Sequence, residues 1–227
     1  MAQQFTKGGQ TAWFHDQGHS GGFFHTYDAF QIAGPQDTPR TVHIFVPRDY
    51  ETSQERYPVI YMNDGDTAFF PGGPVNKSWH MAEILSDLYA THQIRNVIVA
   101  AICPLNRDRE YTHAPVHNRD CCGVDAYAKY VAQRVKPFVD QNYRTLPDGQ
   151  NTMILGSSHG GLAAFYLATH YPDQFWLVGA LSSSFWVGLD SMPLELPFVR
   201  PLRSSKLIDG ARRTLQDASK PLKIYLD

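Results

Sequence analysis

Short apolar runs that are rich in β-branched residues recur along the chain from residue 41 onward, and they predict strands. The run at residues 96–102 is apolar at nearly every position, which is typical of a parallel strand buried on both faces. The run at 41–46 is closed by Pro47, and the run at 57–62 ends at an Asn-Asp-Gly turn. The predicted strands cover residues 41–46, 57–62, 96–102, 152–155, 175–181 and 222–226.

Apolar residues at helical spacing fill the stretches between these strands. The clearest stripe runs through Val124, Tyr127, Val131 and Val135. We expect Pro137 to kink or loosen the last turns of this helix, because proline lacks the N–H that the helix needs. The predicted helices cover residues 78–89, 124–139, 162–169 and 208–216.

From residue 57 onward strands and helices alternate, which predicts an α/β fold with a mostly parallel central sheet and helices on both faces. No helix separates the strands at 41–46 and 57–62, so we expect these two to pair antiparallel at one edge. Residues 1–35 show no sustained period and are expected to form an irregular N-terminal segment of the same single domain, residues 1–227. The stretches 105–122 and 186–203 are expected to be loops at the carboxyl edge of the sheet, where such folds bind ligands.

The segment 152–165 reads as strand, then Gly-Ser-Ser-His-Gly, then helix, and it predicts Ser158 as a nucleophile. A serine hydroxyl is a weak nucleophile, so it must lie exposed on a tight turn where a base can reach it. Glycines at 156 and 160 remove the side chains that would collide with the neighbouring strand and helix. The alternative is a plain tight turn with a buried serine. Ser157 is the rival position, but it lacks the matching glycine spacing.

A serine nucleophile also needs donors for the oxyanion that forms on the substrate. The amide of His159, directly after Ser158, is expected to be one donor. The second should come from the loop after an earlier strand, and the amide of Asp66 in the segment 62–67 is the candidate. The alternative for this segment is a simple Asp-Gly turn.

Five segments of the chain resemble one known family. They are 134–145 (RVKPFVDQNYRT), 151–162 (NTMILGSSHGGL), 57–65 (YPVIYMNDG), 107–112 (RDREYT) and 180–186 (ALSSSFW). Together they are similar to the Putative esterase family of α/β-hydrolases, which includes feruloyl and acetylxylan esterases, esterase D and siderophore esterases. The resemblance covers about residues 38–227. It implies a serine-dependent carboxylic-ester hydrolase with Ser158 as nucleophile and a small-molecule ester as substrate. Relatives often carry Met where this chain has His159, a position that contributes mainly its backbone amide.

The chain departs from this family at its C-terminal end. The family's triad runs from Ser to an Asp or Glu after the next-but-one strand and then to a late His. No histidine follows His170, and Asp227 ends the last predicted strand. The acid, the base, and the last strand and helix of the fold are therefore expected beyond residue 227. Three alternatives stay open: another base such as the His159 side chain, acyl transfer to an alcohol, or a fragment without catalytic activity.

Several aromatic and ionic side chains are further candidates. Trp79, with His80 beside it, and Trp186 are candidates to line a pocket for an aromatic or sugar substrate, although such aromatics are more often core residues. His113 and His117 lie four residues apart in a loop, so a substrate contact or a plain surface loop is open for them. The charged residues of the 107–112 segment favour an ion-paired loop anchor over a contact with an acidic substrate. These are Arg107, Arg109 and Glu110.

Three histidines in the Gly-rich N-terminal segment raise the question of a metal. His15, His19 and His25 match no helix face or zinc-finger spacing, so a locally hydrogen-bonded loop is favoured and no metal or other cofactor is expected. Cys121 and Cys122 are adjacent and the chain has three cysteines, an odd number, so a disulfide framework is not expected.

Composition limits the remaining function classes. The formal net charge of −2 gives no electrostatic case for nucleic acid or an anionic membrane. No apolar run approaches the roughly 20 residues of a membrane span, and the N-terminus does not read as a secretory signal. With the cysteine pattern, this favours the cytoplasm. The strand at 222–226 would present an unpaired edge, so self-association into a homo-oligomer is expected.

Overall fold

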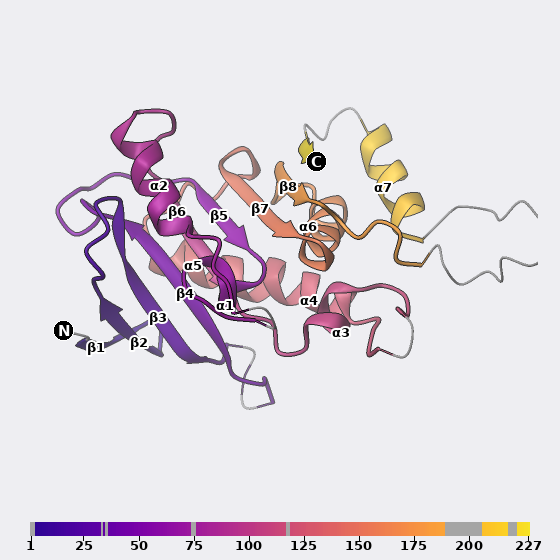
Figure 1. Ribbon diagram of the computed structural model, residues 1–227, viewed down its shortest axis with the longest axis horizontal. Coiled ribbons are helices and arrows are strands. Elements are labelled where there is room, and N and C mark those ends of the chain that lie inside the picture. Colours follow the sequence, from indigo (N-terminus) through magenta and orange to yellow (C-terminus); the bar gives the residue numbers. More distant parts are fainter. Residues whose placement is uncertain are drawn as a thin grey trace, which may run out of the picture.

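The computed structural model describes residues 3–32, 34, 36–73, 76–116, 119–188, 206–217 and 222–227. Within these residues a single nine-stranded sheet has the order β1-β2-β3-β4-β6-β5-β7-β8-β9 (Figure 1). Its strands are β1 (Gln3–Lys7), β2 (Gln10–His15), β3 (Gly22–Phe30), β4 (Arg40–Pro47), β5 (Val59–Met62), β6 (Ile98–Ile102), β7 (Thr152–Ser157), β8 (Leu177–Leu181) and β9 (Lys223–Leu226).

The sheet has a parallel half and an antiparallel half. Strands β6, β5, β7, β8 and β9 run parallel, as the strand–helix alternation predicts. Strands β1 to β4 are antiparallel, and β4 pairs antiparallel with β6. All six predicted strands are confirmed within two residues at each end. The sheet is mixed, with helices on both faces, as in α/β-hydrolases.

The strand at 41–46 does not pair with the strand at 57–62, so the predicted neighbour was wrong. β4 pairs with β6 on one side and with β3 on the other, and it is not an edge strand. The reason is that both sides of β5 are already occupied, by β6 and by β7. β4 and β5 follow each other in the chain, but they are not neighbours in the sheet.

The N-terminal segment is also not irregular, because it forms β1, β2 and β3. The turn between β1 and β2 contains Gly8 and Gly9, both with positive φ, which suits a tight hairpin. Strand β3 is buried at six consecutive positions, so it lacks the alternation that marks a half-exposed strand. Its buried polar residues, His25 and Thr26, further hide the pattern.

Helices lie on both faces of the sheet. They are α1 (Gly65–Ala68), α2 (Met81–Ala90), α3 (Arg107–Tyr111), α4 (Val124–Tyr130), a π-helical turn (Val131–Val135), α5 (Lys136–Asn142), a 3₁₀ turn (Gly149–Asn151), α6 (His159–His170) and α7 (Lys206–Gln216). The four predicted helices are confirmed within a few residues. The loosening expected near Pro137 lies one turn earlier, in the π-helical turn. The expected loop at 105–122 contains α3, and residues 189–203 of the other expected loop lie outside the described residues.

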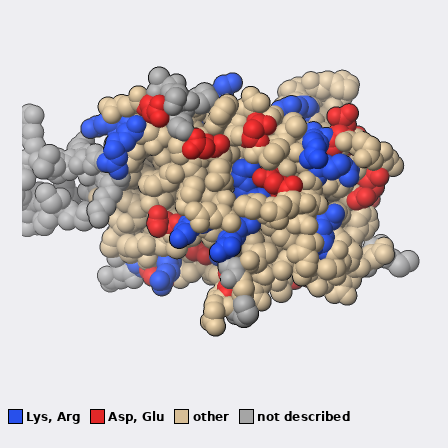
Figure 2. Space-filling view, turned by 180° about the vertical axis from the view of Figure 1, so that it is seen from behind, with Lys and Arg blue, Asp and Glu red and all other residues tan. Residues whose placement is uncertain are grey.

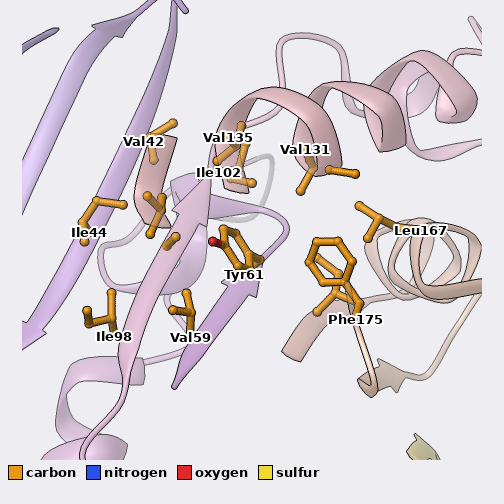
Figure 3. Packing of buried hydrophobic residues seen from close by; sticks show 14 of the residues in the cluster. Val42, Ile44, Val59, Tyr61, Ile98, Ile102, Val131, Val135, Leu167 and Phe175 are labelled. Atoms are coloured by element: carbon orange, nitrogen blue, oxygen red, sulfur yellow. The ribbon is translucent and has the colours of Figure 1, made fainter. Parts of the chain in front are cut away.

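Two apolar cores sandwich the sheet. On one face, Tyr61, Ile98 and Phe175 pack against side chains of α4, the π-helical turn and α6, such as Val131 and Leu167 (Figure 3). On the other face, residues of α2 cover β5 and β6. This sandwich fixes the parallel strands, so the loops at their carboxyl ends are held in place.

Among the described residues on the face seen in Figure 2, acidic and basic side chains are interspersed. In the described part of the chain, no helix is long and apolar enough to cross a membrane. Cys121 and Cys122 are joined by a disulfide, which corrects the expectation from the odd cysteine count. A bond between neighbours needs no second segment, so the count does not prevent it, and the third cysteine, Cys103, stays free and buried.

Candidate active site

Ser158 occupies a strained turn between β7 and α6. Its φ is 55° and its ψ is −120°, a conformation that side-chain-bearing residues rarely adopt. Three backbone hydrogen bonds hold it there. Its amide donates to the Leu181 carbonyl at 2.9 Å, and its carbonyl accepts from the amides of Leu162 and Ser184, each at 3.1 Å. These contacts hold the turn in its strained conformation. The rival Ser157 does not lie in the turn, because it is the last residue of β7.

The two glycines of the motif allow a close approach that no other residue would. A Cβ on Gly156 would collide with the carbonyl oxygen of Gly160. A Cβ on Gly160 would lie 2.7 Å from Asp64 Oδ2, in the loop after β5. The collisions expected from the sequence are confirmed, and the loop after β5 lies directly against the start of α6.

Hydrogen bonds join the loop after β5 to the turn at Ser158. The Asn63 amide donates to the Leu155 carbonyl at 2.9 Å, which continues the parallel pairing of β5 with β7. The Asn63 side chain donates to the Gly160 carbonyl at 2.7 Å. Asp66 lies in the first turn of α1 and His159 in the first turn of α6, where amides have no partner within the helix. The fold thus brings both predicted donor segments to one edge of adjacent strands; their role as oxyanion donors stays a prediction.

An ion pair anchors the same loop. Arg107 of α3 binds the carboxylate of Asp64 through two hydrogen bonds of 2.7 and 3.0 Å. Glu110 pairs with the buried Arg40 at 2.8 Å, while Arg109 reaches Asp120 only at 3.8 Å on the surface. The predicted ion-paired loop anchor is confirmed.

A short chain of side-chain contacts leads away from the Ser158 hydroxyl. Ser158 Oγ lies 3.1 Å from Ser184 Oγ, and Ser184 Oγ lies 2.9 Å from His159 Nδ1. Ser184 and His159 are 3% and 6% exposed. Burial lowers the pKa of His159, and the nearby Arg107 adds to this effect. Sequence reasoning missed Ser184, because its place three residues after β8 is informative only once β8 is known to lie beside β7.

A cleft of about 440 Å³ opens beside the elbow, which is the segment 156–160 that contains the turn between β7 and α6. Trp79 forms part of its wall, and its role in substrate binding stays a prediction. Trp186 packs edge-on against the His159 ring, with ring centroids 5.9 Å apart. Burial raises the pKa of Asp66, with the Asp64 charge adding to the rise. The cleft is lined by Asp64, Asp66, Thr67, Gly73, Lys77, Ser78, Trp79, Arg107 and Ser157.

A family model described as "Putative esterase" matches residues 35–212. The chain belongs to the Putative esterase family. A relative from Bacillus subtilis, "Uncharacterized protein YbbA", is 23% identical over 168 residues, which cover 71% of this chain and 64% of that protein. The "Endo-1,4-beta-xylanase/feruloyl esterase" of Xylanibacter ruminicola is 24% identical over 65% of this chain and 20% of its own length.

Solved structures share the fold of this chain. The crystal structure of an IroE-like serine hydrolase from Shewanella oneidensis superimposes with a TM-score of 0.68 at 21% identity, covering 89% of this chain and 60% of the other. This likeness confirms the α/β-hydrolase architecture. The chain spans just under two thirds of the length of YbbA and about a fifth of that of the xylanase/feruloyl esterase.

The other candidates of this esterase-family chain lie away from the cleft. His113 lines a separate pocket with His170 beside α6 and α7, and His117 lies outside the described residues. His15 and His25 belong to strands, not to the expected loop, and hydrogen-bond with Thr26 and Tyr143. Over the residues that the structure describes, no group of three or more His, Cys, Asp or Glu side chains is arranged to hold a metal.

His80, the neighbour of Trp79, is directed elsewhere. Its ring is exposed and lies 3.6 Å from Glu83 in the first turn of α2. Of the predicted site residues, the structure joins Ser158 to His159 through Ser184, with Trp186 packed against the His159 ring. It places Asp66 and Trp79 in the wall of the adjacent cleft, together with Asp64, Arg107 and Ser157, the residue before Ser158.

Proposed function

We propose that this chain is a serine-dependent carboxylic-ester hydrolase that acts through an acyl-enzyme on Ser158. The observation that carries the proposal is the strained φ of 55° at Ser158, between β7 and α6 and next to the loop after β5. Strain of this kind persists only where surrounding contacts hold it, and it is concentrated at functional sites. Membership of the Putative esterase family supports ester hydrolysis as the reaction.

In the proposed reaction Ser158 Oγ attacks the ester carbonyl carbon and forms a tetrahedral intermediate. The amides of His159 and Asp66 hold its oxyanion, and the N-terminus of α6 adds a favourable dipole. Collapse of the intermediate releases the alcohol and leaves the acyl group on Ser158. Attack by water then releases the carboxylic acid and restores the serine.

The substrate that we propose is a small-molecule ester bound in the 440 Å³ cleft. Trp79, 37% exposed in the wall of this cleft, offers a flat apolar surface to an acyl or alcohol group. Because one relative is named a feruloyl esterase, methyl ferulate is a suitable aromatic substrate to compare with p-nitrophenyl acetate.

The test is hydrolysis of both esters by the 227-residue chain and by Ser158→Ala, together with labelling by a fluorophosphonate that is located by peptide mass spectrometry. We expect Ser158→Ala to lose both the turnover and the adduct. Ser157→Ala is the matched control and is expected to carry the adduct on Ser158. Unchanged turnover in Ser158→Ala would contradict the proposal.

A further inference from the structure

Ser184 lies between the proposed nucleophile and a buried histidine. Its hydroxyl oxygen is 3.1 Å from Ser158 Oγ on one side and 2.9 Å from His159 Nδ1 on the other. Both contacts are hydrogen bonds, and the one between the two serine hydroxyls is slightly long. A hydroxyl can donate one hydrogen bond while it accepts another, so Ser184 can connect the two groups in series.

The backbone fixes this spacing. The Ser184 amide donates to the Ser158 carbonyl at 3.1 Å, so the same two residues are joined through both main chain and side chain. The Ser158 amide in turn donates to the carbonyl of Leu181, the last residue of β8. The loop after β8 is thereby bound to the elbow, and Ser184 is 3% exposed. The position of its hydroxyl is therefore fixed by the fold, because a buried side chain cannot rotate as freely as one on the surface.

The His159 ring can present an unprotonated nitrogen to Ser184. It is 6% exposed and packs edge-on against Trp186. Its Nε2 has no hydrogen-bond partner among the described residues, so no partner restricts the ring to the tautomer that has its proton on Nδ1. The tautomer with the proton on Nε2 leaves the Nδ1 lone pair facing Ser184.

Charged groups around the His159 ring act in both directions. Burial lowers its pKa, and the positive charges of Arg107 and Arg119 lower it further, while the negative charges of Asp108 and Asp64 raise it. The net effect is a lowered pKa, so the ring is neutral near pH 7 and its lone pair is available.

We infer that Ser184 and His159 form a proton path that activates Ser158, an inference that rests on the proposed function. As Ser158 Oγ bonds to the acyl carbon, its proton passes to Ser184 Oγ, and the proton of Ser184 passes to His159 Nδ1. The result is a neutral Ser184, a His159 imidazolium and the oxyanion. When the intermediate collapses, His159 Nδ1 returns its proton to Ser184 Oγ, and the Ser184 hydroxyl gives its own proton to the departing alkoxide, which leaves as the alcohol. Ester and serine hydroxyl are thus converted to acyl-serine and alcohol with no other reactant.

The experiment measures the second-order rate constant for labelling of Ser158 by a fluorophosphonate, between pH 4.5 and 8.5, on the 227-residue chain. In the unmodified protein this rate constant should rise with pH, with its midpoint below the ordinary histidine value of about 6.5. His159→Gln keeps a side chain that can hydrogen-bond with Ser184 but cannot take a proton. It should lower the plateau by roughly 10²-fold or more and remove the pH-dependent limb.

Three further variants make the outcome decisive. Ser184→Ala should lower the rate as His159→Gln does, and Ser184→Thr, which keeps the hydroxyl, should recover a measurable part of it. His170→Gln, at the exposed end of α6, is the matched histidine control and should leave rate and pH profile unchanged. Circular dichroism checks that each variant is folded, and Ser184→Ala provides the answer if His159→Gln does not fold.

The outcomes separate this inference from the proposed function. Labelling of Ser158 at the same rate and with the same pH profile in His159→Gln and Ser184→Ala would overturn the proton path and leave the esterase proposal standing. Absence of any adduct on Ser158 in the unmodified chain would overturn both. A lower rate that keeps the pH-dependent limb in His159→Gln would assign the histidine a structural role only and also overturn the path.

Discussion

The guanidinium group of Arg107 binds both carboxylate oxygens of Asp64, with Nε 2.7 Å from Oδ1 and Nη2 3.0 Å from Oδ2. Its Nη2 also donates to the Ser157 carbonyl at 3.2 Å. Asp64 has a φ of 56°, and its amide donates to the Tyr111 hydroxyl at 2.9 Å. Arg107 of α3 therefore joins the loop after β5 to the residue that precedes the proposed nucleophile.

Replacing Arg107 should disturb this junction. The Asp64 side chain is 11% exposed, so Arg107→Gln would leave a largely desolvated carboxylate without its cation. Because the Arg107 side chain is itself 34% exposed, water will screen part of the loss. We expect a loss of about 1–3 kcal/mol in the free energy of unfolding in urea and at least a ~10-fold drop in labelling of Ser158. Arg107→Lys should be intermediate, because lysine keeps the charge but not the planar fork.

Arg109→Gln is the matched control for Arg107→Gln. Arg109 lies two residues further along α3, and its contact with Asp120 is 3.8 Å long, with both side chains at least half exposed. Such surface pairs contribute little, so the expected change is within about 0.5 kcal/mol. Equal losses in the two glutamine variants would contradict the assigned role of the Arg107–Asp64 pair.

Loss of the hydroxyl should affect the stability of the protein differently at two buried tyrosines. The Tyr127 hydroxyl donates to Asn63 Oδ1 at 2.6 Å, and the Asn63 side chain continues to the Gly160 carbonyl. Tyr127→Phe would leave a buried amide oxygen unsatisfied, which should cost about 1–3 kcal/mol of unfolding free energy.

Tyr61 is the contrasting case. It is fully buried in the core (Figure 3), and its hydroxyl has no hydrogen-bond partner among the described residues. Because that hydroxyl is desolvated without compensation, Tyr61→Phe should leave the stability unchanged or raise it. Urea unfolding of both phenylalanine variants measures the difference, and a Tyr61→Phe loss as large as that of Tyr127→Phe would show that the Tyr61 hydroxyl has a partner.

The sequence predicts those strands whose pattern of apolar and polar residues matches their burial in the folded sheet. Strand β6 is buried at all five positions, and its sequence is apolar throughout. Strand β3 is buried at its first six positions, but these include His25 and Thr26, so its sequence pattern resembles neither a buried nor a half-exposed strand. Pairing also depends on which strands occupy both sides of β5, and that is a property of the whole sheet.

The same division applies to the site. Ser158 is predictable because strand, turn and helix are consecutive in the chain, and the conformation of the turn depends on nearby glycines. Ser184 and Asp64 are not, because each reaches the elbow from a different loop, after β8 and after β5. Charged and hydroxyl residues in loops are common, and only the assembled sheet edge selects these two.

The stability of the protein should depend on pH through a buried histidine of β3. His25 is 4% exposed, and burial lowers its pKa from 6.5 to about 4, with the charges of Lys7 and His15 adding to the effect. The unfolded chain binds this proton near pH 6.5, so between about pH 6.5 and 4 the unfolded state holds more protons than the folded state. The free energy of unfolding should therefore be highest above pH 6.5 and fall as the pH is lowered through this window.

His25→Phe tests this dependence. The ring lies among aromatic neighbours such as Phe5 and Phe23, so phenylalanine suits the site. Tyr143, which contacts His25 Nδ1 at 3.2 Å, keeps its hydrogen bond to the Tyr27 hydroxyl at 2.7 Å. The free energy of unfolding in urea should fall between pH 7.5 and pH 4.5 in both proteins. We expect the fall to be about 1–3 kcal/mol smaller in His25→Phe than in the unmodified protein. Because burial also lowers the pKa of His43 to about 4, part of the slope should remain. A slope identical to that of the unmodified protein would show that His25 does not contribute to the acid sensitivity.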